Sequence, residues 1–138
     1  MTGSLIINID VPDLVAAIVF YETGLGFRLR RKLFNDSVAE IEGAGGRIFL
    51  IEQPAGSTAV PGTSIARRYA AHWTPVHLDI AVSDLFAAVA RARAAGATQS
   101  GPVSQHPFGD IAPMRDPFGH GFCLIAFNGV GYDAGVSG

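Results

Sequence analysis

Residues 76–85 read VHLDIAVSDL, a segment in which an alternating pattern gives way to a helical one. His77 and Asp79 fall on one side of an extended strand, and Ile80 falls on the other. From residue 84 onward, apolar residues recur at helical spacing behind a capping aspartate. The segment therefore predicts a strand over 76–82 that is followed directly by a helix over 84–95.

A second copy of this pattern lies near the N-terminus, where residues 6–14 read IINIDVPDL. At an offset of 71 residues, the matched positions are Ile6 and His77, Asn8 and Asp79, Val11 and Val82, and Asp13 and Asp84. Two later strands, IFLIE at 48–52 and FCLIA at 122–126, match at an offset of 74. These matches predict two copies of one unit, a strand and a helix followed by three strands.

The predicted organisation is a single domain over 4–127 made of two βαβββ modules, 4–53 and 76–127, which is an α+β fold. The connection 54–75 is rich in proline and glycine, with a short helix expected at 64–71. In the second module, Pro102 favours an edge position for a strand over 99–105. The glycine-rich tail, 128–138, is expected to be flexible.

Composition excludes several classes of function. The 138 residues carry a net charge of −2, so nothing favours nucleic acid or an anionic membrane as a partner. The longest apolar run, 14–21, is too short to span a bilayer. Apolar residues make up 49% of the chain, which favours a homodimer with an additional buried surface. The single cysteine, Cys123, excludes an intrachain disulfide and fits a cytoplasmic location.

Charged residues in the first module follow two of its predicted strands. In the strand 27–33, Arg28, Arg30 and Lys32 share one face, which we expect to be solvated, and Arg31 lies on the other face. In the next strand, 37–42, Glu40 and Glu42 share a face. The glycine-rich segment 43–46 joins strand to strand, so it predicts a hairpin turn and not a phosphate loop.

Several short motifs in this order resemble the vicinal oxygen chelate superfamily, which includes glyoxalase I, extradiol dioxygenases, and fosfomycin- and bleomycin-resistance proteins. The motifs are VPDL at 11–14, FY at 20–21, GLGF at 24–27, AAGA at 94–97 and DPFG at 116–119, together with the segment from His77 to Leu85. The resemblance implies that each module curls a mixed sheet and that the two modules build a shared cavity. It also implies that metal-dependent members place ligands on the first and last strands of each module.

Carried over by motif, the metal positions here are Ile6, Phe49, His77 and Cys123. Ile6 and Phe49 cannot bind a metal, and a thiolate beside an imidazole suits zinc better than iron or manganese. We therefore expect no metal and no other cofactor, although His77 and Cys123 leave a divalent metal possible.

The resemblance implies two alternative functions. The first is a protein that binds a small organic molecule in an apolar cavity and has no complete metal site. The expected lining of that cavity is Ile6, Phe49, Cys123 and Ile125, with Asn8, His77 and Asp79 as polar points. The second is a metal-dependent lyase, isomerase or dioxygenase acting on a substrate with vicinal oxygens. A metal-free enzyme with His77 as catalytic base is a further possibility.

Overall fold

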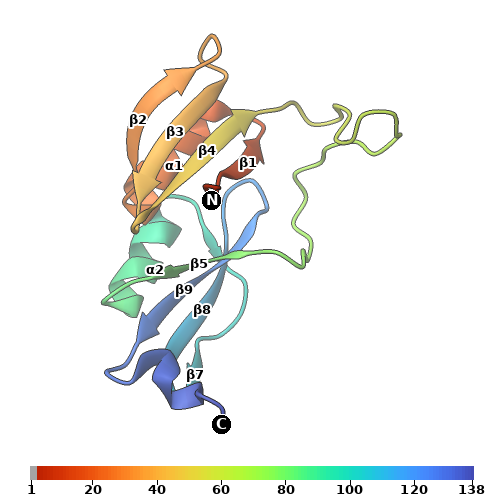
Figure 1. Cartoon of the computed structure of the whole chain (residues 1–138). Helices are drawn as coiled ribbons and strands as arrows, with labels where there is room; N and C mark the ends of the chain where they lie inside the picture. Colours follow the sequence, from red (N-terminus) through yellow and green to blue (C-terminus); the bar gives the residue numbers. More distant parts are fainter. Residues whose placement is uncertain (1–2) are drawn as a thin grey trace. The chain divides into compact units, whose positions relative to one another are not determined.

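The computed structural model describes residues 3–138. These residues form two compact units, of which the first ends at Ala70 and the second is Ala71–Gly138. The elements of the first unit are β1 (Ile7–Val11), α1 (Leu14–Leu25), β2 (Arg28–Leu33), β3 (Val38–Gly43) and β4 (Gly46–Glu52). Its sheet has the order β1-β4-β3-β2, with β1 parallel to β4 and the other neighbours antiparallel. Helix α1 packs on one side of this sheet (Figure 1). We call the other side the open face.

The second unit repeats this order. Its elements are β5 (Leu78–Ala81), α2 (Leu85–Ala94), β6 (Thr98–Gln99), β7 (Ser104–His106), β8 (Gly109–Arg115) and β9 (Gly121–Phe127). The sheet order is β5-β9-β8-β6, β7 also pairs with β8, and β5 is parallel to β9. The predicted α+β fold with two βαβββ modules is confirmed. The strand predicted over 99–105 is broken into β6 and β7 around Pro102, which has no backbone N–H to donate.

The two helices begin in the same way. The side chain of Asp13 accepts a hydrogen bond from the backbone N–H of Ala16, and Asp84 does the same for Ala87, both at 3.1 Å. Each aspartate has an extended backbone and satisfies a donor that the first helical turn leaves free. The sequence match at an offset of 71 residues is thus a match of cap geometry as well.

Each unit has its own apolar core between helix and sheet. In the first unit, Leu50 of β4 is fully buried opposite Ala39 of β3. In the second unit, Leu124 of β9 is buried opposite Ala112 of β8, in the corresponding register. Burying these alternating side chains of the last strands against a helix fixes which face of each sheet is left open.

The alternation predicted for the strand 27–33 is wrong beyond residue 29. The register between β2 and β3 shifts between Leu29 and Arg31, which is the signature of a β-bulge. Arg28 therefore lies opposite Glu42 while Arg31 lies opposite Glu40, and both arginines reach the open face. The hairpin turn predicted at 43–46 is present, with Ala44 and Gly45 at positive φ as a type I′ turn requires.

The connection between the modules has no helix at 64–71, so that prediction is wrong. Arg67 instead forms backbone hydrogen bonds with Gly56 and Ser57 at 2.7 and 2.8 Å, which fold the segment back on itself. The Nε of Arg67 also donates to Asp10 of β1 at 2.8 Å, and this ion pair ties the segment to the first sheet. These tertiary bonds outweigh a modest local preference for helix.

In the C-terminal tail, Gly131–Gly135 forms a short 3-10 helix whose Tyr132 ring lies 4.7 Å from the ring of Phe127, centroid to centroid. The flexibility of the tail stays a prediction. Within residues 3–138, neither α-helix has both the length and the apolar character needed to cross a membrane.

Candidate functional site

Three side chains with metal-binding or acid–base chemistry meet in the second unit. The parallel register of β5 and β9 places Asp79 directly opposite Cys123, so both side chains lie on the same face. His77 precedes Asp79 by two residues, and its Nδ1 lies 3.0 Å from Oδ1 of Asp79. One donor atom from each of the three residues lies within 4.8 Å of the others. We call these residues the His77–Asp79–Cys123 cluster.

The thiol of this cluster is held in its protonated form. Partial burial raises the pKa of Cys123, and the charge of Asp79 and a hydrogen bond to its carboxylate raise it further. Because the thiolate is the nucleophilic form, Cys123 is poorly suited to covalent catalysis in the metal-free protein.

The cluster supports two kinds of chemistry. Imidazole, carboxylate and thiolate are the donors that zinc prefers, and three protein ligands would leave a position open for a substrate oxygen. Without a metal, the contact between Asp79 and Nδ1 of His77 fixes the imidazole and leaves Nε2 as the atom that can take a proton. The side chain of His77 is 52% exposed, so Nε2 is within reach of a dissolved small molecule.

The first unit has the same backbone arrangement with different side chains. Asn8 lies opposite Phe49 in the parallel register of β1 and β4, just as Asp79 lies opposite Cys123. Ile6 precedes Asn8 by two residues, in the place of His77. Ile6 and Phe49 offer no ligand atoms, so the first unit contributes carbon surface where the second contributes donors.

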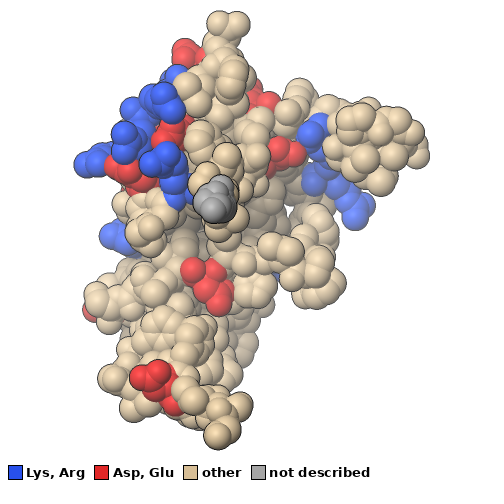
Figure 2. Space-filling view, in the orientation of Figure 1, with Lys and Arg blue, Asp and Glu red and all other residues tan. Residues whose placement is uncertain are grey.

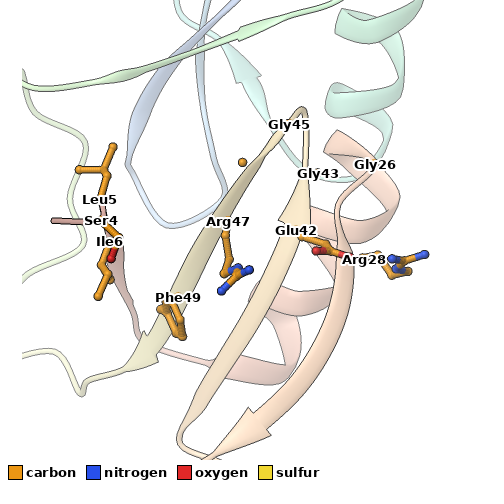
Figure 3. A pocket seen from close by; sticks show the side chains of 11 residues that line it. Ser4, Leu5, Ile6, Gly26, Arg28, Glu42, Gly43, Gly45, Arg47 and Phe49 are labelled. Carbon is orange, nitrogen blue, oxygen red and sulfur yellow. Dashed lines mark hydrogen bonds and ion pairs between the residues drawn. The ribbon is translucent and has the colours of Figure 1, made fainter. Parts of the chain in front are cut away.

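A cavity of about 820 Å³ lies against these residues in the first unit (Figure 3). Its lining comes from the segment before β1, from the start of β2 and from the β3–β4 hairpin: Ser4, Leu5, Ile6, Gly26, Arg28, Glu42, Gly43, Gly45, Gly46, Arg47 and Phe49. Ile6 and Phe49 were predicted to line a cavity. Arg28, Glu42 and Arg47 were not predicted, and they give its wall a charged part.

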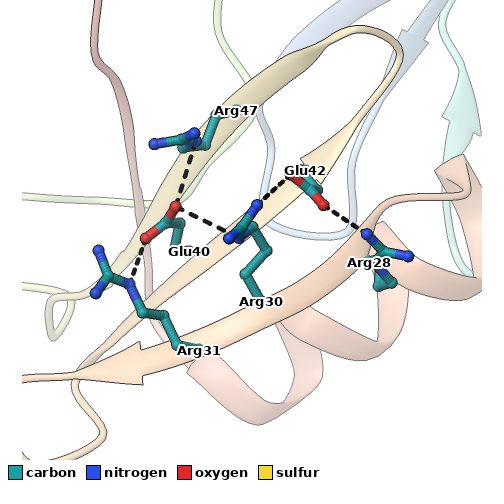
Figure 4. Close-up of polar contacts among 6 residues, drawn as sticks. All are labelled: Arg28, Arg30, Arg31, Glu40, Glu42 and Arg47. Atoms are coloured by element: carbon teal, nitrogen blue, oxygen red, sulfur yellow. Dashed lines mark hydrogen bonds and ion pairs between the residues drawn. The ribbon is translucent and has the colours of Figure 1, made fainter.

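These charged residues belong to a network on the open face, which we call the arginine–glutamate network: Arg28, Arg30, Arg31, Glu40, Glu42 and Arg47 (Figure 4). The side chain of Glu40 is only 2% exposed. Its Oε1 lies 2.7 Å from Nε of Arg31, and its Oε2 lies 3.3 Å from Nε of Arg47. The carboxylate is therefore covered by the guanidinium groups that neutralise it.

Glu42 is bound in the same manner. Its two oxygens lie 2.6 Å from Arg28 and 3.0 Å from Arg30. The hydrogen bond from Arg31 lowers the pKa of Glu40, and the bonds from Arg30 and Arg28 lower that of Glu42. Both carboxylates thus stay ionised below the pH at which free glutamate takes up a proton.

Sequence reasoning missed this network because the basic strand was expected to be solvated. Figure 2 shows that Lys and Arg side chains do gather over β2, with acidic side chains among them. The sequence did contain a signal for this network. Glu40 and Glu42 lie on β3, the strand next to the basic strand β2, and opposite charges on adjacent strands attract one another.

The other residues proposed from sequence lie elsewhere. Asn8 is exposed on the open face and is not among the cavity-lining residues. Ile125 of β9 is 1% exposed, lies on the same face of its strand as Cys123, and is not among the residues that line the cavity of the first unit.

Comparison with known proteins places the chain in a family. A sequence profile of the glyoxalase-like domain matches residues 6–125. No curated protein gives a significant match. Among solved structures, the genomically encoded fosfomycin resistance protein FosX of Listeria monocytogenes is 19% identical, with a TM-score of 0.68 over 93% of this chain and 95% of that one.

Two further structures agree in fold. A glyoxalase-related enzyme from Fulvimarina pelagi is 18% identical, with a TM-score of 0.68 over 91% of this chain and 88% of its own. A glyoxalase/bleomycin resistance protein from Albidiferax ferrireducens is 21% identical, with a TM-score of 0.62 over 88% of this chain and 96% of its own. At these identities the likeness concerns the fold alone. The repeated units and the match over residues 6–125 show that the chain belongs to the glyoxalase-like domain family of the vicinal oxygen chelate superfamily.

Proposed function

We propose that the protein binds a small organic molecule in the cavity of its first unit. The observation that carries this proposal is the cavity itself, whose volume of about 820 Å³ falls in the usual range for ligand sites, about 300–1,000 Å³. Phe49 supplies a half-buried aromatic surface within it, and Arg28, Glu42 and Arg47 supply a few polar groups that can orient a ligand. The similarity to a fosfomycin resistance protein and to a glyoxalase/bleomycin resistance protein supports small-molecule recognition as the class of function.

This proposal is tested by a thermal-shift screen of small organic molecules against the whole chain. A ligand that binds the folded state raises Tm by mass action. Each hit is then measured on Phe49→Ser and on the control Phe86→Ser, which changes an exposed phenylalanine of α2. We expect Phe49→Ser to abolish the shift and Phe86→Ser to keep it. A screen without hits, or hits that Phe49→Ser leaves unchanged, would contradict the proposal.

A second candidate is a metal-dependent lyase, isomerase or dioxygenase, favoured by the His77–Asp79–Cys123 cluster. The three residues fit a zinc site in number and donor type, and zinc bound there would polarise an oxygen of the substrate. The chain's own part would be to hold the ion through His77, Asp79 and Cys123.

Elemental analysis of the purified protein, before and after incubation with zinc, manganese, nickel and iron(II), decides between the candidates. The enzyme candidate expects about one metal per chain, lost in His77→Ala and retained in His106→Ala, a histidine of β7 outside the cluster. Protein that stays metal-free under every condition would remove this candidate and leave small-molecule binding.

We also propose that the protein is a homodimer. Large apolar side chains are strongly exposed in both units, including Leu5 in the first and Trp73 and Val76 in the second. Sedimentation equilibrium is expected to give twice the chain mass of 14.5 kDa. The chain mass alone, at micromolar concentration, would contradict the proposal.

A further inference from the structure

The charges beside the cavity of the first unit are out of balance. The arginine–glutamate network holds four arginines and two glutamates. Each glutamate oxygen is already within ion-pair distance of a guanidinium, so neither carboxylate has an unoccupied oxygen left for a cationic ligand. The network therefore carries a net positive charge, and the guanidinium N–H groups that bind no glutamate oxygen are available as hydrogen-bond donors.

Arg47 brings this excess to the wall of the cavity. Only its Nε is engaged, at 3.3 Å from Oε2 of Glu40, and its two Nη groups form no ion pair or hydrogen bond with any other side chain of residues 3–138. Its side chain is 56% exposed, so these donors are accessible. A guanidinium presents donors in a planar fork that fits a carboxylate or a phosphate.

An aromatic ring lies next to that fork. Phe49 is two residues after Arg47 on β4, so both side chains lie on the open face, and both line the cavity (Figure 3). Ile6 and Leu5 add carbon surface to the same cavity. A ligand that satisfies both parts needs an apolar body to lie against Phe49 and an anionic group to bind Arg47.

Resting on the proposed function, we propose that the ligand is an organic anion, with an aromatic or otherwise apolar body and a carboxylate or phosphate group that binds Arg47. Glu40 acts as the positioning residue, because its buried carboxylate fixes the Nε side of Arg47 and turns the free donors outward. Arg28 borders the same cavity and contributes to the positive potential there.

The test uses two matched probes, naphthoate and naphthamide, which share an aromatic body and differ in charge. Binding to the full chain is measured by fluorescence titration at low and high salt. We expect naphthoate to bind at least about tenfold tighter than naphthamide, the size of one charge-assisted hydrogen bond. Because the contact is solvent-accessible, the preference should weaken at high salt.

Three variants locate the effect. Arg47→Gln should remove the preference for naphthoate, and Arg47→Lys should keep part of it through charge alone. Arg31→Gln is the matched control, because Arg31 binds the same buried carboxylate but does not line the cavity. It should keep the preference, which separates ligand recognition from a general disturbance of the network.

The outcomes separate this inference from the proposed function. Equal binding of both probes, lost in Phe49→Ser, would overturn the anion inference while supporting the cavity as a binding site. A naphthoate preference that survives Arg47→Gln, or that Arg31→Gln abolishes equally, would also overturn it, as would the failure of both probes to bind at millimolar concentration. In that last case the wider thermal-shift screen still decides whether the cavity binds any small molecule.

Discussion

The two units of this chain place different chemistry on equivalent strands. In the first unit Asn8 lies opposite Phe49, and in the second Asp79 lies opposite Cys123, in the same parallel register. The residue two positions earlier is Ile6 in one unit and His77 in the other. One unit therefore presents carbon surface beside excess arginine donors, and the other presents three clustered donor atoms.

This difference shows which residues determine the backbone and which are free to vary. The positions that the units share are buried or cap a helix, as with Leu50 and Leu124 or Asp13 and Asp84. The positions that differ are on the sheet face away from the helix, where packing against the helix imposes no side chain. Function can therefore change within one family while the fold remains.

A matched pair of core substitutions, for which we expect the largest effect, tests whether both cores are equally well packed. Leu50→Ala and Leu124→Ala each remove a fully buried side chain from an equivalent strand position. We expect each to lower the free energy of unfolding by about 2–5 kcal/mol, measured by urea denaturation. A loss below about 1 kcal/mol in only one variant would mean that the cores are not equivalent.

The helix caps offer a smaller, matched comparison. Asp13→Ala and Asp84→Ala each remove one capping bond of 3.1 Å, and each should lower the free energy of unfolding by about 1 kcal/mol. The Asn variants, which keep an accepting oxygen, should recover most of that loss. Unequal losses in the two alanine variants would show that the repeated sequence signal hides a difference in local stability.

The free energy of unfolding should depend on pH through the first unit, because Arg31 lowers the pKa of Glu40 and Arg30 lowers the pKa of Glu42. An unfolded chain binds these protons near the ordinary glutamate pKa, about 4.3. The stabilisation is therefore complete above that pH and is lost as the pH falls through the lower folded values. We expect the free energy of unfolding to decline over this acid range, and to decline less steeply in Glu42→Gln. If the unchanged chain and Glu42→Gln lost stability with the same slope, the pH dependence could not be assigned to Glu42.

The smallest expected effect concerns the thiol of the second unit. Since burial and then Asp79 raise the pKa of Cys123, the metal-free protein should react slowly with iodoacetamide at neutral pH. Asp79→Asn removes the negative charge and should speed alkylation several-fold at unchanged pH. Mass spectrometry of the intact chain follows the reaction, and Asp84→Asn, on the adjacent helix cap, serves as the control. An unchanged rate in Asp79→Asn would mean that burial alone protects the thiol.

Much of the fold could be predicted from the sequence because its signals are local. Alternation in 76–82, the aspartate caps and the glycine turn at 43–46 each describe a few neighbouring residues, and the strand with its capped helix occurs in both units. The resemblance to a known superfamily then supplied the positions of Ile6, Phe49, His77 and Cys123, two of which line the cavity and two of which belong to the cluster.

The rest depended on contacts between distant residues. The bulge in β2 shifts the alternation by one residue. Arg31 therefore contacts Glu40 on the face opposite to the one that strict alternation predicts for it. The fold of the connection depends on Arg67 meeting Asp10, a pair separated by 57 positions. Neither event leaves a pattern within one segment, which is why the arginine–glutamate network and the absence of a helix at 64–71 were missed.

An NMR titration of the isotope-labelled full chain with naphthoate tests most directly whether the ligand site lies in the first unit. We expect the largest backbone amide shifts at Ile6, Arg47 and Phe49, and Arg47→Gln should diminish them. Amide shifts that leave these three residues unchanged and centre on His77, Asp79 and Cys123 would contradict this expectation and assign binding to the cluster of the second unit.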